Sequence, residues 1–155
     1  MHSNNLIARL TLGANLGVFI ALVLVLAELN QIRDLMKSQV RHDLSTDIIA
    51  IQLAAAGGEG LADIIRRASK GEELTPTETI RFRLRLNALL RYWEELHSQY
   101  RLGHYDEAQF LNQREIWSSY LREVHGLAEY WCETSTRFTA EFQREIGTLL
   151  PDDAC

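Results

Sequence analysis

Residues Leu10 to Ala27 carry no charged side chain, and most of them are apolar. A stretch of about 18 such residues is typical of a helix that crosses a bilayer. Extended to residue 6, it would form a helix about 33 Å long, whereas a hydrocarbon core is about 30 Å thick. We therefore predict a short tail and one transmembrane helix at 6–27, with the lipid bilayer as the first partner of the chain.

A cleaved secretory signal peptide is the alternative interpretation of this segment. Val25 and Ala27 match a small-residue cleavage pattern, and Arg9 would supply the positive start. However, one Arg is a weak positive start, and the apolar stretch exceeds the roughly 7 to 15 residues of a signal-peptide core. The sequence favours a retained single-pass anchor.

The Lys and Arg residues beside the span indicate its orientation. Arg9 precedes the span, whereas Arg33, Lys37 and Arg41 follow it. The flank with more Lys and Arg usually stays in the cytoplasm. This count predicts a cytoplasmic C-terminal domain, by a small margin.

The two cysteines suggest the same compartment. Cys132 lies in an apolar context and Cys155 is the last residue, so neither resembles part of a disulfide framework. We expect an unpaired, buried thiol, which suits a reducing compartment.

Beyond residue 27 the composition becomes polar and predicts one soluble body. The chain has 16 Lys and Arg against 21 Asp and Glu, a net charge of -5, which argues against nucleic acid as a partner. Only Pro76 and Pro151 interrupt the helical pattern, and no segment alternates like a strand. The predicted fold is all-α: a transmembrane helix that continues into a small antiparallel bundle. The predicted divisions are 1–27 for tail and span, 28–56 for a juxtamembrane helix and 57–155 for a helical soluble domain.

Capping signals divide the soluble part into helices. Thr75, Pro76 and Glu78 match a capping box with proline at the first helical position, which predicts a long helix up to about Leu102. Asp106 begins the next predicted helix, which is expected to end at Gly126. The other predicted helices are 28–56, 61–69, 127–133 and a last one capped by Thr139.

Apolar stripes at helical spacing predict the core. The stripe on the long helix comprises Phe82, Leu86, Leu89, Trp93, Leu96 and Tyr100. The facing stripe comprises Phe110, Trp117, Leu121 and Val124, and Trp131, Phe138 and Phe142 are expected to cover the open end. The stripe on the juxtamembrane helix comprises Leu29, Met36, Val40, Leu44, Ile48 and Ile51, and it is available to hold the C-terminal helices.

From about residue 27 to 150 the chain resembles a group of small bacterial single-pass membrane proteins of uncharacterised function. The matching residues are Leu74 to Glu78, Arg81, Phe82, Tyr92, Trp93, Glu94, Tyr100 and Gly103. The resemblance implies a protein of the bacterial inner (plasma) membrane with a helical body. It implies no activity, because the shared residues are caps and core aromatics.

Small residues in the span predict association within the membrane. Gly13, Gly17 and Ala21 lie four apart on one helix face, which permits close approach of a second helix. Asn15 places a polar group at membrane depth, on another face, where it would favour an interhelical partner. The candidate partners are a second copy of the chain, forming a homodimer, or another membrane protein. The alternative is that glycine is simply common in membrane helices.

The densest group of charges comprises Arg81, Arg83, Arg85 and Arg91. Arg81 and Arg85 share a helix face and could hold an anion or the carboxylate of a partner. The alternative is that they pair with neighbouring acidic residues, such as Glu78 and Glu95, in a solvated face.

Metal and catalytic motifs are incomplete. Glu94 and His97 have the spacing of half a di-iron site, but no second copy exists, and His104 and His125 are only candidate additional ligands. We predict no cofactor, no metal and no catalytic residue. The predicted function is a membrane-anchored, non-catalytic interaction or regulatory protein. The alternative is a membrane-tethered ligand or metal sensor, which would require a concave pocket with convergent polar groups.

Overall fold

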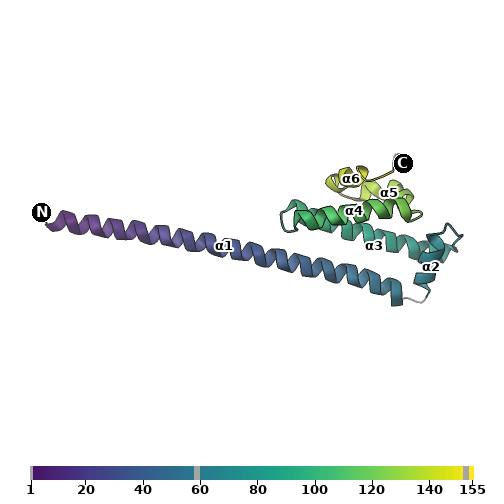
Figure 1. The fold of residues 1–155 in the computed structure, drawn as a ribbon, viewed down its shortest axis with the longest axis horizontal. Helices are drawn as coiled ribbons and strands as arrows, with labels where there is room; N and C mark the ends of the chain where they lie inside the picture. The colour runs from purple at the N-terminus through teal and green to yellow at the C-terminus, as the bar shows by residue number, and fades with distance from the viewer. Residues whose placement is uncertain (1, 58–59, 152–153) are drawn as a thin grey trace. The chain divides into compact units, whose positions relative to one another are not determined.

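The structure is a computed structural model that describes residues 2–57, 60–151 and 154–155, with side chains from residue 13 onward. Within these ranges the chain is helical and contains no strand, which confirms the all-α prediction (Figure 1). The elements are α1 His2–Gly57, α2 Leu61–Ala68, α3 Pro76–Arg101, α4 Glu107–Glu123, α5 Leu127–Thr134, the 3-10 helix η1 Ser135–Arg137, and α6 Ala140–Gly147.

The chain divides into two compact units, one ending at Gln39 and one from Val40 to Cys155. In the first unit, α1 is long and apolar enough to cross a membrane, and the residues of its apolar window are exposed. The second unit begins inside the predicted juxtamembrane helix, because residues 40–57 of α1 belong to it. The helical domain discussed below is this second unit.

The predicted caps explain where the long helices begin. The Glu78 backbone N–H donates to Thr75 Oγ1 at 3.4 Å and the Thr75 N–H donates to Glu78 Oε2 at 2.8 Å, which completes the capping box of α3. At the start of α4, Asp106 Oδ1 accepts from the Gln109 N–H at 3.1 Å. Both interactions satisfy amide groups that a helix start leaves without an intrahelical partner.

One helix boundary and one cap differ from the sequence prediction. α4 ends at Glu123, and Gly126, with φ 78°, is the residue before α5. A residue in this left-handed conformation turns the chain sharply, so glycine is suited to it. Thr139 precedes α6, but its side chain makes no capping hydrogen bond. Instead its N–H donates to the carboxylate of Glu94 at 2.7 Å.

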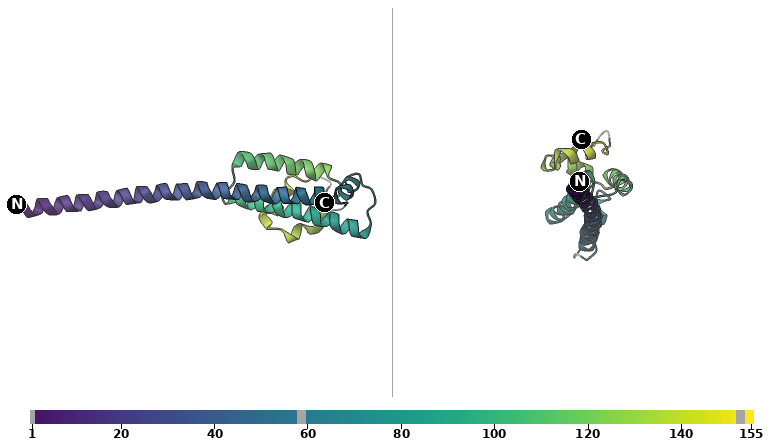
Figure 2. Two further views of the ribbon diagram at one scale, coloured as in Figure 1. Left: turned by 90° about the horizontal axis from the view of Figure 1, so that it is seen from below. Right: turned by 90° about the vertical axis from the view of Figure 1, so that its left-hand side faces the viewer.

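The helical domain is built in layers around α3 and α4. Residues 40–57 of α1 lie on one face of this pair, where Leu44 joins the core (Figure 1, Figure 2). α5 and α6 pack on the opposite face. The two predicted facing stripes supply the core. Their residues are buried, except Tyr100 and Val124, which are half-buried. Trp93 and Trp117 stack with ring centroids 5.3 Å apart at the centre of the α3–α4 interface. Trp131, Phe138 and Phe142 are also buried, as predicted.

Only part of the stripe on α1 joins this core. Leu44 is 4% exposed, and Val40 and Ile48 are partly buried against the core cluster. Leu29 and Met36 stay exposed in the first unit. The helical domain therefore holds α1 mainly through the turns around Leu44.

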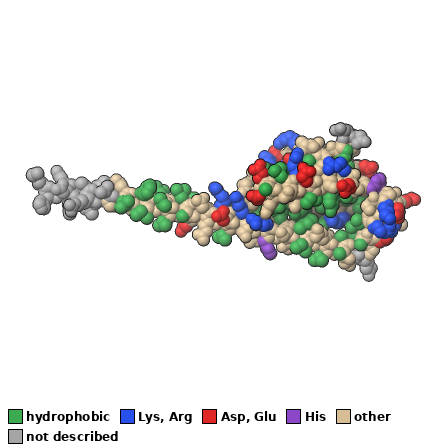
Figure 3. Space-filling model, viewed as in Figure 1, with side chains coloured by type: hydrophobic (Ala, Val, Ile, Leu, Met, Phe, Trp, Pro, Cys, Tyr) green, Lys and Arg blue, Asp and Glu red, His purple; other side chains and the backbone are tan. Residues whose placement is uncertain are grey.

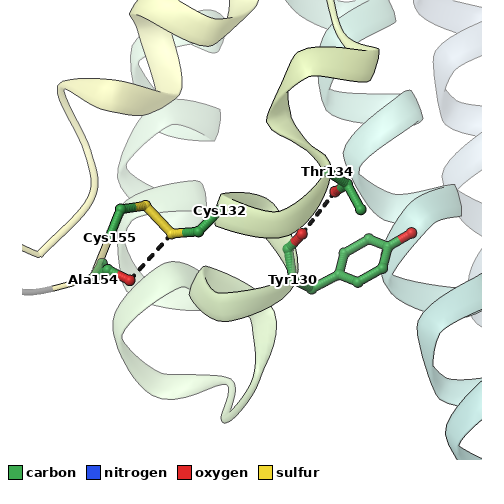
Figure 4. The surroundings of a disulfide bond; sticks show 5 residues. All are labelled: Tyr130, Cys132, Thr134, Ala154 and Cys155. Carbon is green, nitrogen blue, oxygen red and sulfur yellow. Dashed lines mark hydrogen bonds between the residues drawn. A yellow bond between two sulfur atoms is a disulfide. The ribbon is translucent and has the colours of Figure 1, made fainter.

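The expectation of an unpaired, buried thiol is wrong. Cys132 in α5 and Cys155 form a disulfide, and their Cα atoms lie 5.7 Å apart (Figure 4). Cys132 is half-buried and Cys155 is exposed. The bond fastens the C-terminal end of the chain to α5. The sequence interpretation missed it because it weighed the context of each cysteine separately, whereas the fold decides which residues meet.

Candidate functional site

A groove opens between α1 and α3 beyond the turns at which Leu44 packs. It is lined by Ala50, Ile51 and Ala54 of α1, Leu61 of α2, and Arg81, Leu84, Arg85 and Ala88 of α3, and encloses about 620 Å³. We call it the α1–α3 groove. Hydrophobic side chains gather on this face of the helical domain (Figure 3).

Helix periodicity accounts for the shape of the groove. Ala50 and Ala54 lie four residues apart and so share one face of α1, and Ala88 lies four residues beyond Leu84 on α3. Alanine side chains are too short to fill the space between two helices, so the walls stay apart here. The groove is thus a consequence of three small residues at matching positions.

Arg85 is the unusual residue of the groove. Its Nε and Nη1 atoms are buried and have no hydrogen-bond partner. These two atoms carry three of the five N–H donors of a guanidinium group. Desolvation by burial lowers the pKa of Arg85, and the nearby Tyr120 opposes this effect. Shielding the donors of a cation from water without a partner is costly for a folded protein.

The acidic residues expected to neutralise this cation are engaged elsewhere. Glu78 accepts from Arg67 and from the Thr75 N–H, and Glu95 accepts from Gln99 at 2.7 Å. Neither carboxylate contacts Nε or Nη1 of Arg85.

The structure brings together the two predicted anion contacts and separates the other arginines from them. Arg81 and Arg85 both line the groove. Arg83 forms a salt bridge with Glu133, and Arg91 donates to Glu94 at 2.7 Å. The arginine group of the sequence thus divides into one pair at the groove and two residues that bind neighbouring helices.

A larger cavity of about 920 Å³ lies between α3 and the segment before α6. Four of its charged side chains form two pairs: Arg91 with Glu94, and Arg101 with Glu141 at 3.6 Å. The Nη2 atom of Arg91 also donates to the Arg137 carbonyl at 3.1 Å. Because most of its charges are compensated in this way, this cavity is the weaker candidate for a binding site, although it is larger.

The candidate metal ligands do not converge. His97 is buried between Phe110 and Phe142, with ring centroids 6.0 and 5.8 Å away. His104 contacts Gln99 at 3.0 Å, and Glu94 binds Arg91 and the Thr139 N–H. Among the described side chains, no three His, Cys, Asp or Glu residues are grouped to hold a metal ion.

The predicted association residues of the span, Gly13, Asn15, Gly17 and Ala21, are exposed along α1. A Cβ atom added at Gly13 or Gly17 would meet nothing within 4 Å. Their surface is available to a neighbouring helix, and association through it stays a prediction.

The groove residues of α1 and α2 were not predicted as site residues. The sequence signal for them is Ala50 and Ala54, which lie four residues apart on α1 just after the large apolar residues Leu44 and Ile48. Comparison with known proteins adds no constraint, because no family model, curated protein or solved structure matches the chain.

Proposed function

We propose that this chain is a single-pass, membrane-anchored, non-catalytic binding protein whose helical domain takes up its partner in the α1–α3 groove. The observation that carries the proposal is the position of Arg85, a cation that lines an apolar groove and whose Nε and Nη1 atoms are shielded from solvent without an acceptor. Binding sites are commonly apolar cavities with a few polar groups that fix orientation. A regulatory role follows, in which occupancy of the groove is communicated to a neighbour in the membrane.

The composition of the groove favours binding over catalysis. Its only polar side chains are those of Arg81 and Arg85. Catalysis requires a positioned nucleophile or an acid–base group, and neither arginine serves as a general base because a guanidinium stays protonated. The lining therefore offers recognition of charge and shape.

We further propose that the helical domain lies on the oxidising side of a bacterial plasma membrane. Structural disulfides persist in oxidising compartments and are rare in the cytoplasm. The Cys132–Cys155 bond supports this side, against the small excess of Lys and Arg after the span. A C-terminal alkaline phosphatase fusion tests the topology: activity is expected here, and an inactive fusion would restore the cytoplasmic prediction.

The glycine face of α1 supports a homodimer or a contact with a membrane-protein partner. Changing Gly13 and Gly17 together to Ile would remove close helix approach, so crosslinked dimer in membranes should disappear. Replacement of Leu22 by Ile, on the opposite face of the helix, is the matched control. Unchanged dimer in the double variant would exclude this contact.

Site-specific photo-crosslinking tests the groove as the binding site. A photoreactive residue replaces Leu84, which is exposed in the groove, in the full chain in native membranes, and the same residue replaces Leu111 on α4 as the control. We expect an adduct of defined mass at position 84 only, and its loss when Ala54→Trp fills the groove. The proposal fails if positions 84 and 111 give the same products.

A further inference from the structure

The α1–α3 groove restricts the chemistry of its occupant through its walls. Apart from the two arginines, the lining side chains are Ala, Ile and Leu. They offer neither donors nor acceptors to the hydroxyl groups of a sugar or the polar edges of a nucleobase, and burial of such groups without partners is unfavourable. The body of the occupant must therefore be apolar.

The volume of the groove favours a slender occupant. A three-turn helix about 10 Å wide and 16 Å long occupies about 1,200 Å³, whereas the groove encloses about 620 Å³. The volume lies within the range of small-molecule sites. The groove is therefore better matched to a single extended hydrocarbon chain than to a helix.

The arginine side chains of the groove favour an occupant whose apolar body ends in a negatively charged group. Arg85 lines the groove, and its Nε and Nη1 donors are shielded from solvent without an acceptor, so a change of its rotamer would bring them to an anion in the groove. In a site of low polarity, a hydrogen bond from such a donor to an anion is stronger than the same bond in water. A carboxylate fits a guanidinium because its two oxygens accept parallel hydrogen bonds.

We propose that the groove binds an amphiphile with one hydrocarbon chain and a carboxylate head, such as a long-chain fatty acid. The carboxylate lies at Arg85 and the hydrocarbon chain runs along the alanine-lined walls of α1 and α3. This inference rests on the proposed function, since it names the partner of the same groove. An acidic protein segment at the groove is the competing occupant and is an outcome of the test.

The experiment uses the full chain in phosphatidylcholine nanodiscs. Palmitate that carries a photoreactive diazirine is the probe, and the matching palmityl alcohol is its uncharged control. After irradiation, modified peptides are located by mass spectrometry. We expect the acid to label the segments around Leu84 and Ala54 about tenfold more than the alcohol does, since hydrogen bonds to charged groups contribute about that factor or more.

Variants assign the effect to the guanidinium. Arg85→Gln should reduce labelling of the groove by the acid about tenfold, and Arg85→Lys should retain more of it than Arg85→Gln. Arg83→Gln is the matched control, because Arg83 is on the same helix and binds Glu133 instead. Tryptophan fluorescence, which reports the core, shows whether each variant is folded.

Three results would overturn the inference. Equal labelling of the groove by acid and alcohol would exclude recognition of the carboxylate, and labelling only within residues 13–27 would show that the probe stays in the bilayer. Labelling that persists in folded Arg85→Gln would exclude Arg85 as the contact.

If the crosslinker at Leu84 captures a protein while the groove takes no palmitate, only the amphiphile proposal fails. If both experiments are negative, the groove is not a binding site.

Discussion

Replacing Arg85 by Met is expected to stabilise the folded helical domain. In the structure, Nε and Nη1 of Arg85 are buried without a partner, and an unsatisfied buried donor costs about 1 to 3 kcal/mol. Arg85 is only partly buried, so the lower end applies, and we expect a gain of about 1 kcal/mol. Met keeps an unbranched stem against the apolar wall and removes the charge.

Thermal unfolding of the full chain in detergent measures this gain. Tryptophan fluorescence is the suitable signal, because Trp93, Trp117 and Trp131 are all buried in the helical domain and none lies in the span. For a domain of this size, 1 kcal/mol corresponds to an increase in Tm of about 4 °C. Binding of an anionic ligand should decrease in the same variant.

Arg83→Met is the matched control on the same helix. Arg83 binds Glu133, and its guanidinium carbon lies 5.0 Å from the ring centroid of Tyr130, so this variant loses contacts and should leave Tm unchanged or slightly lower. The two variants are thus expected to differ in sign. A fall in stability of about 1 kcal/mol or more in Arg85→Met would refute the reasoning, because it would show that the guanidinium has a stabilising partner.

Three further variants test the framework around the groove. Cys155→Ser should lower the stability of the helical domain by about 3 kcal/mol, given a bond that closes 23 residues, and wild-type protein should react with maleimide only after reduction. Burial lowers the pKa of His97, so the unfolded chain binds a proton first and stability falls as the pH falls below about 6.5; His97→Phe should flatten that part of the stability profile. Thr75→Ala removes one arm of the capping box of α3 and should cost about 1 kcal/mol in chemical denaturation.

The fold was largely predictable because its signals are local. The capping box at Thr75 and the aromatic stripe from Phe82 to Leu96 each depend on residues within a few turns of one helix. Periodicity also identified the face of α1 that packs, including Leu44. Such patterns specify which side of a helix is buried without knowledge of its neighbour.

The groove and the disulfide were not predictable in the same way, because they depend on how distant segments meet. Ala50 and Ala88 are ordinary helix residues in the sequence, and only their juxtaposition leaves a space. Cys132 and Cys155 are separated by an irregular segment and a helix, so their pairing requires the path of the chain. The choice between a paired and an unpaired Arg85 likewise required knowing that Glu78 binds Arg67.

Arg85 conflicts with the rest of the helical domain, whose side chains mostly satisfy simple packing and pairing rules. Arg83, Arg91 and Arg114, on the same helix or the next, each bind an acidic partner, which shows that the fold readily supplies counter-charges. At Arg85, by contrast, Nε and Nη1 are shielded from solvent and have no partner, which lowers the stability of the folded domain. Sites that violate the local rules of a fold are commonly functional. The amphiphile proposed above would bring an anion to Arg85, and its binding would recover part of this free energy and stabilise the folded domain.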